Sequence, residues 1–167
     1  LMQITLRTPQ GMPKDTYSVT KTIPQIKVAS PPPGHLIFVV DRSGSMYGEM
    51  ESVRSTLERM IVAADMTSLQ LKVSLLSYSS QGDYTTHFAG VDISKASTDA
   101  GCTREIKRLQ ATGLTSPSQA MRAALQMIQQ AKGEAVTVLL HSDGYANDPG
   151  VRSEQSAVTE LAKQMSA

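Results

Sequence analysis

Short apolar runs, each followed by polar turn residues, dominate the hydrophobic pattern of the chain. Residues 36–40 and 135–140 are almost entirely apolar, and runs of this length are typical of parallel strands buried on both faces. Apolar residues also mark residues 71–78 as a strand. Residues 84–88 predict a short strand that pairs with it across a tight turn.

Between these strands, apolar residues recur three or four positions apart, which is the spacing of an amphipathic helix. The spacing predicts helices over residues 49–64, 103–109, 116–131 and 151–165, with Ser116 as a helix cap. Strands that alternate with helices of this size indicate an α/β fold. We expect a doubly wound, Rossmann-like and mostly parallel sheet with helices on both faces.

The N-terminal part of the chain follows a different pattern. Apolar and polar residues alternate around Ile4 and again around Val19, as in half-buried strands, and a proline run at residues 31–33 follows. We expect residues 1–33 to form a short β segment with a proline-rich tether, and residues 34–167 to form the α/β domain. Because the chain does not begin with methionine and stops on a helix, we expect it to belong to a longer protein and this domain to be C-terminally incomplete.

Composition narrows the function further. A chain of 167 residues that is 40% hydrophobic and 19% charged is long enough for one domain with a buried core. A net charge of +1 and an aromatic content of 4% argue against nucleic acid as a partner. No apolar run approaches the roughly 20 residues that a membrane helix needs. The single cysteine, Cys102, cannot form a disulfide framework and favours a reducing compartment such as the cytoplasm.

Oxygen-bearing side chains follow the two buried strands. Asp41, Ser43 and Ser45 come directly after the first strand, Asp143 comes after the second, and Thr115 lies in a glycine-containing loop before a helix. Open α/β sheets bind ligands at the carboxyl ends of their strands, where these loops meet if the two strands are neighbours. Each motif alone could be an ordinary turn or a helix cap, but together they predict one site.

The chemistry of these side chains predicts the kind of ion. Carboxylate and hydroxyl oxygens are hard ligands, which suit Mg²⁺, Mn²⁺ or Ca²⁺ rather than zinc. The carboxylates of Asp41 and Asp143 would neutralise a divalent ion, and the hydroxyl ligands add no charge. Because Mg²⁺ takes a small octahedral site and retains waters, whereas Ca²⁺ takes more carboxylates, we expect Mg²⁺, with Mn²⁺ and Ca²⁺ as alternatives.

In their order and spacing, these motifs resemble the metal-ion-dependent adhesion site of the von Willebrand factor type A domain family. The resemblance covers residues 35–167. The family's Asp-x-Ser-x-Ser, Thr and Asp-Gly elements appear at residues 41–45, 113–115 and 142–144. The arginine inside the first element is more similar to bacterial members than to integrin inserts.

The resemblance implies a role for each residue. Ser43 and Ser45 would bind the metal directly through their hydroxyls. Thr115, Asp41 and Asp143 would bind it directly or through water. An Asp or Glu side chain of a protein partner would then complete the coordination shell, so the resemblance implies a protein-binding module and not an enzyme.

Two positions depart from the family pattern, and three others flank the site. Leu114 and Ser142 replace the residues that the family often has there, and we expect neither to touch a ligand. Tyr47, Tyr145 and Asn147 are candidates for the rim of a binding face.

Other functions are open at this stage. A hydrolase is one alternative, because Ser, His and Asp are all present, but the Gly-x-Ser-x-Gly motif is absent. Substitution of His141 separates the two functions, since a triad would lose activity and a metal-dependent module would keep it. The partner is also open. The domain could serve as an adaptor subunit for an AAA-type ATPase, without a phosphate-binding loop of its own, or as an extracellular adhesin.

Overall fold

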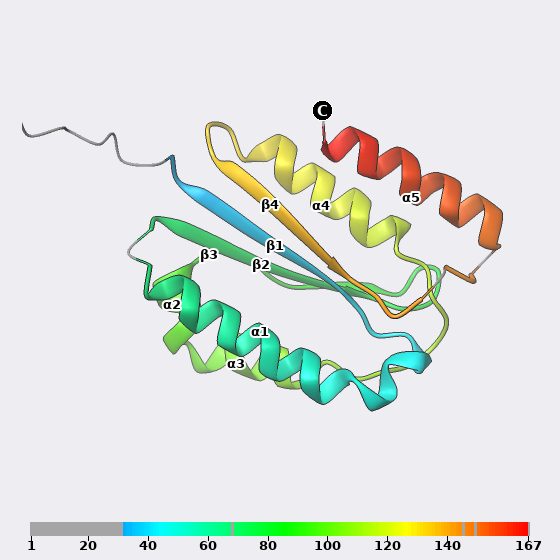
Figure 1. Ribbon diagram of the computed structural model, residues 1–167, viewed down its shortest axis with the longest axis horizontal. Coiled ribbons are helices and arrows are strands. Elements are labelled where there is room, and N and C mark those ends of the chain that lie inside the picture. The colour runs from blue at the N-terminus through cyan, green and yellow to red at the C-terminus, as the bar shows by residue number, and fades with distance from the viewer. Residues whose placement is uncertain (1–31, 68, 145, 149, 167) are drawn as a thin grey trace, which may run out of the picture. The chain divides into compact units, whose positions relative to one another are not determined.

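Four strands form one sheet in the part of the chain that the computed structural model describes, which is residues 32–67, 69–144, 146–148 and 150–166. The strands lie in the order β3-β2-β1-β4, and β1 runs parallel to both β2 and β4, whereas β3 is antiparallel to β2 (Figure 1). Their bounds are β1 Gly34–Asp41, β2 Leu71–Tyr78, β3 Tyr84–Asp92 and β4 Ala135–His141. The β segment predicted over residues 1–33 lies almost wholly outside the described residues.

Helices cover both faces of this sheet, as the sequence predicted. Helices α1 to α3 lie on one face, and α4 and α5 lie on the other (Figure 1). Their bounds, with a preceding 3₁₀ helix η1, are η1 Gly44–Gly48, α1 Met50–Asp65, α2 Ile93–Thr98, α3 Ala100–Lys107, α4 Ser118–Gln130 and α5 Val151–Met165. No helix within the described ranges is both long enough and apolar enough to cross a bilayer.

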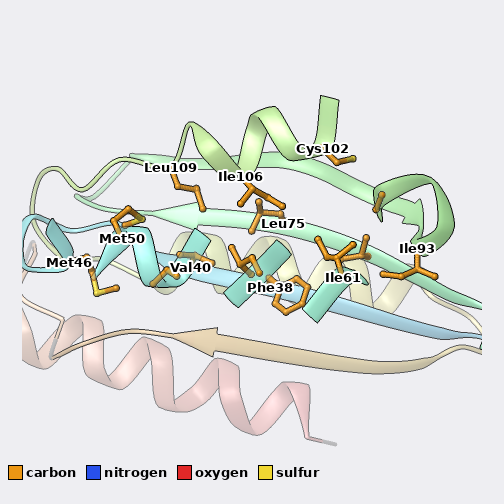
Figure 2. Close-up of a cluster of buried hydrophobic side chains, with 14 residues drawn as sticks. Phe38, Val40, Met46, Met50, Ile61, Leu75, Ile93, Cys102, Ile106 and Leu109 are labelled. Atoms are coloured by element: carbon orange, nitrogen blue, oxygen red, sulfur yellow. The ribbon is translucent and has the colours of Figure 1, made fainter. Parts of the chain in front are cut away.

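The two faces of β1 explain its continuous apolar run. Phe38 and Val40 point into the core under α1 to α3, where Ile61 and Ile106 meet them (Figure 2). The alternate residues of the strand, such as Ile37, pack in a second core beneath α4. Both cores are needed to bury the strand, because successive side chains of a strand point to opposite faces.

The segment between β2 and α4 differs from the prediction. The helix predicted at 103–109 is α3, which begins at Ala100 because the Asp99 side chain caps it by accepting a hydrogen bond from Gly101 N at 2.6 Å. Helix α2 was not predicted, since its six residues are too few to show a helical period. Strand β3 continues past the predicted end at residue 88 to Asp92. The alternation of apolar residues did not reveal this continuation, because a bulge with Gly90 at φ +59° interrupts it there.

Two further predictions were wrong. Strand β4 is not buried on both faces, and Leu139 and Leu140 are exposed by 36% and 44%, because β4 forms the sheet edge among the described strands and the helices pack on β1 and β2. Ser116 does not cap α4. The buried Glu154 of α5 takes that role, since its carboxylate accepts hydrogen bonds from Ser118 N at 2.6 Å and from Ser116 Oγ at 3.1 Å.

Candidate metal centre

Three loops meet at the carboxyl edge of β1 and β4, and backbone hydrogen bonds hold them together. The loop after β1 contacts the α3–α4 loop twice, through Gly44 N to Gly113 O at 2.9 Å and Thr112 N to Arg42 O at 2.7 Å. The α3–α4 loop in turn contacts the β4–α5 loop. There, the N–H of residue 147 donates to the carbonyl of residue 115 at 2.9 Å. These bonds fix the loops independently of any ligand.

Asp41 ends β1 and is fully buried. Its Oδ1 accepts a hydrogen bond from Ser43 N at 2.8 Å. Its Oδ2 accepts hydrogen bonds from the Tyr78 hydroxyl at 3.2 Å and from Ser142 Oγ at 2.6 Å. A buried carboxylate with this many donors has its orientation fixed, and its burial cost is partly offset by the donors.

Hydroxyl and carboxylate oxygens of three predicted residues form a chain that leads from the interior to the surface. Ser43, which is buried, shares a hydrogen bond with Ser45, with 3.0 Å between the two Oγ atoms. Ser45 Oγ donates to Asp143 Oδ1 at 3.1 Å. Because Ser45 and Asp143 are exposed, an incoming molecule can reach this end of the chain.

Thr115 is buried on the neighbouring loop. Its backbone is fixed by Asn147, whose side-chain Oδ1 accepts from Thr115 N at 2.8 Å. Within the described residues, no hydrogen bond joins the Thr115 hydroxyl to the other predicted ligands. The structure therefore connects Asp41, Ser43, Ser45 and Asp143 directly and places Thr115 on a loop bonded beside them.

Two residues next to Asp41 were missed or misjudged from the sequence. Ser142 was expected to touch no ligand, which is wrong, because it donates to Asp41. Tyr78 pairs with Asp41 in the β1–β2 register, and burial raises the pKa of its phenol well above the usual range, so it remains a donor. The role of Ser142 could have been inferred from the sequence, because its hydroxyl stands next to Asp143. The role of Tyr78 could not, because it depends on the register between β1 and β2.

The β2–β3 turn, formed by residues 79–83, supports the loop after β1. The guanidinium of Arg42, which lies inside the Asp-x-Ser motif, forms an ion pair with Asp83 of the turn. Asp83 also accepts a hydrogen bond from Ser79 Oγ at 2.5 Å. The charge of Arg42 is therefore paired with Asp83, so Arg42 is not a free cation at the site.

The same turn contacts both remaining loops. Leu114 N donates to Ser80 Oγ at 2.9 Å, and Gln81 N donates to Asp148 Oδ2 at 2.7 Å. The β2–β3 turn and the α3–α4 loop approach each other closely at Gly113. A Cβ at Gly113, where φ is +73°, would lie 2.6 Å from Ser80 Oγ, so this position requires glycine. The sequence predicted only a tight turn between two paired strands here, yet this turn contacts all three loops.

The donor set fits a small divalent cation. The Oγ–Oγ and Oγ–Oδ1 distances of 3.0 and 3.1 Å are close to the edge of an Mg²⁺ octahedron, which is about 2.9 Å for ligands at about 2.0–2.1 Å. Among the described residues, no group of three or more His, Cys, Asp or Glu side chains could hold a metal. Hydroxyl oxygens are therefore essential to this donor set, which disfavours zinc.

A doubly wound α/β domain with oxygen donors at the carboxyl edge of its sheet defines the class of protein. The model of the von Willebrand factor type A domain matches residues 35–166, and the chain belongs to this family. No curated protein matches the chain in a sequence search.

Solved structures share the fold. The pilus adhesin SpaC from Lactobacillus rhamnosus GG is 21% identical with a TM-score of 0.61, and the match covers 68% of this chain and 15% of SpaC. The vWF domain of the type V pili tip protein Mfa5 from Porphyromonas gingivalis is 20% identical with a TM-score of 0.57, and the match covers 69% of this chain and 39% of that one. Manganese-loaded Plasmodium vivax TRAP protein is 20% identical with a TM-score of 0.60, and the match covers 80% of this chain and 53% of TRAP. The chain thus spans less than two thirds of each of these proteins.

Proposed function

We propose that this domain is a metal-dependent protein-binding module. Asp41, Ser43, Ser45, Thr115 and Asp143 would hold the ion, with Mg²⁺ preferred over Mn²⁺ and Ca²⁺. The observation that carries this proposal is the chain of oxygens from Ser43 to Asp143, whose spacing matches adjacent ligands of an octahedral cation. When bound, the metal would supply an electrophilic position that accepts a carboxylate oxygen from an Asp or Glu of the partner.

The protein's own residues divide this work between them. Asp41 is buried and oriented by three donors, so it supplies a fixed negative charge at the base of the site. Asp143 supplies the second charge at the exposed end, next to Ser45. The two charges neutralise a divalent ion, and the exposed end leaves room for a partner's side chain.

The similar structures support this proposal to different degrees. The TRAP structure contains manganese, which is consistent with a divalent cation in this family. SpaC is a pilus adhesin, which is consistent with a binding role. At about one fifth identity, neither resemblance identifies the partner of this chain.

The serines that lie within hydrogen-bond distance of a histidine are buried, which argues against the hydrolase alternative. Within the described residues, no hydrogen bond links His141 to a serine or an aspartate. Elsewhere, His35 Nε2 lies 2.8 Å from Ser74 Oγ, and its Nδ1 lies 3.7 Å from Glu134 Oε2, an arrangement similar to a triad. However, Ser74 is 0% exposed on β2, so no substrate carbonyl can reach its hydroxyl.

A second group of serine, histidine and glutamate side chains also contains a buried serine. His87 Nε2 lies 2.8 Å from Ser77 Oγ, and His87 Nδ1 lies 3.2 Å from Glu105 Oε2. Ser77 is also 0% exposed. Nucleophilic catalysis needs a serine that a substrate can approach, so these histidines link β2 to its neighbours and do not activate a nucleophile.

The proposal is tested with a pentapeptide that carries one glutamate between glycines, and with its glutamine counterpart. NMR titration should detect binding of the glutamate peptide in Mg²⁺ but not in EDTA, and no binding of the glutamine peptide. Asp143→Ala should lose this binding. Asp92→Ala should keep it, because Asp92 is an exposed carboxylate that pairs with Lys72 at the opposite edge of the sheet. Equal binding in Mg²⁺ and EDTA would contradict the proposal.

A further inference from the structure

Glu154 is a buried carboxylate that the proposed metal centre does not use as a ligand. It lies in the first turn of α5 and is 5% exposed. Among the described residues, no ion pair joins it to a lysine or an arginine. Burying a carboxylate without a cation beside it is costly, so the hydrogen bonds that it accepts must offset this cost.

Both of these hydrogen bonds connect Glu154 to the segment that carries Thr115. Its Oε1 accepts from Ser118 N at 2.6 Å and from Ser116 Oγ at 3.1 Å. Ser116 directly follows Thr115 in the chain, and both residues are buried. Glu154 therefore holds the residue next to a proposed metal ligand.

The segment that contains Glu154 also carries Asp143. It begins with the loop after β4, where Asn147 Oδ1 accepts from Thr115 N at 2.8 Å, and it continues into α5. The bond to Asn147 lies before the Thr115 side chain along the backbone, and the bond from Ser116 to Glu154 lies after it. Residues 143–154 thus supply one proposed ligand and hold the backbone of another from both sides.

The stability of α4 alone does not require this arrangement. A serine or aspartate at the start of the helix would satisfy its N–H groups locally, without burying a carboxylate from another helix. Ser116 does not provide such a cap, because its hydroxyl donates to Glu154. A cap that comes from α5 differs from a local cap in one respect, since it joins the loop of Thr115 to the segment of Asp143.

Resting on the proposed function, we propose that Glu154 is a positioning residue of the metal centre. By accepting hydrogen bonds from Ser116 and Ser118, it keeps the Thr115 loop in place beside the segment of Asp143. It does not touch the ion, so its effect on metal affinity passes through Thr115.

The test is a double-mutant cycle in which isothermal titration calorimetry measures Mg²⁺ affinity. Thr115→Val removes the hydroxyl and leaves four proposed ligands, so it should weaken binding by about tenfold. Glu154→Ala should weaken binding by at least about threefold, and by no more than Thr115→Val does. In the Thr115→Val background, Glu154→Ala should cause no further loss, because the hydroxyl through which it acts is already gone.

Two further variants separate positioning from general stability. Glu154→Gln keeps an oxygen that can accept both hydrogen bonds, so it should bind Mg²⁺ like the parent. Asp99→Ala removes the cap of α3, which also accepts a backbone hydrogen bond at 2.6 Å, and in the described part of the chain the Asp99 side chain bonds to none of the three loops. This control should lower the thermal unfolding midpoint and keep the Mg²⁺ affinity of the parent.

Parent-like affinity in Glu154→Ala would overturn the proposal, and so would the same loss from this substitution with and without the Thr115 hydroxyl. A weakened Glu154→Gln, or an equal loss of affinity in Asp99→Ala, would also overturn it. In each of these cases, Mg²⁺ binding by the parent would still support the proposed function. A parent chain that does not bind Mg²⁺ would overturn both.

Discussion

At the scale of single residues, the candidate site depends on how Asp41 is held. Its fully buried carboxylate accepts hydrogen bonds from Ser43 N, Tyr78 and Ser142. Removing Asp41 would leave the buried Tyr78 hydroxyl without this acceptor, so Asp41→Ala should lose stability as well as metal. Residues around Asp41 are therefore better probes of the site than Asp41 itself.

Ser142 allows such a probe. Its hydroxyl donates to Asp41 Oδ2 at 2.6 Å, and groups that orient a metal ligand typically change metal affinity by about 10–100-fold when they are removed. Ser142→Ala should weaken Mg²⁺ binding by about tenfold in isothermal titration calorimetry, because Tyr78 still orients the same oxygen. Ser142→Thr, which keeps the hydroxyl, should bind like the parent. Parent-like affinity in the alanine variant would show that this hydrogen bond has no such role.

At the scale of elements, the β2–β3 turn was the part of the site that the sequence could not reveal. Its bonds to the three loops are made by backbone N–H groups, by Ser80 and by the Arg42–Asp83 pair, all far apart in sequence. Such contacts leave no periodic pattern and no recognisable spacing. The turn explains how loops from three separate connections keep one arrangement.

If the β2–β3 turn supports the site, a substitution in the turn should weaken Mg²⁺ binding. Ser80→Ala removes the acceptor for Leu114 N, beside Thr115. The ion would then have to order a loop that has lost about 1 kcal/mol of support, so Mg²⁺ affinity should fall, by about fivefold at most. Ser97→Ala is the control, since Ser97 Oγ also joins two elements, α2 and α1, by donating to Asp65 Oδ2 at 2.7 Å. Calorimetry should show an unchanged affinity in Ser97→Ala. If both variants lost Mg²⁺ affinity equally, the loss in Ser80→Ala would reflect a general loss of stability and not support of the site by the turn.

Elements with strong periodicity were predicted well, and those fixed by specific contacts were not. Strand β2 and helix α5 have the predicted bounds, because apolar residues at strand or helical spacing occur near both of their ends. Helix α2 was missed because it is short, and the start of α3 was misplaced because it depends on the Asp99 cap. The cap of α4 comes from Glu154, distant in sequence, which no local pattern could indicate.

At the scale of the whole domain, parallel pairing explains why the site could be anticipated at all. Because β1 lies next to β4 in parallel register, with Val40 opposite His141, the residues that follow both strands must meet at one edge. Strand type therefore predicted that Asp41, Ser45 and Asp143 meet if the two strands are neighbours, and the sheet order shows that they are. The distances between their oxygens, and which of them are exposed, required the structure.

The most direct test of the central claim is the thermal unfolding midpoint of the whole chain in Mg²⁺ and in EDTA. An ion that binds only the folded state stabilises it by about 2.7 kcal/mol at a hundredfold excess over Kd, which raises the midpoint of a domain of this size by roughly 5–11 °C. We expect this rise in the parent and in Asp92→Ala, and its loss in Asp143→Ala. The same midpoint in Mg²⁺ and EDTA for the parent, or an undiminished rise in Asp143→Ala, would contradict a metal centre at this edge of the sheet.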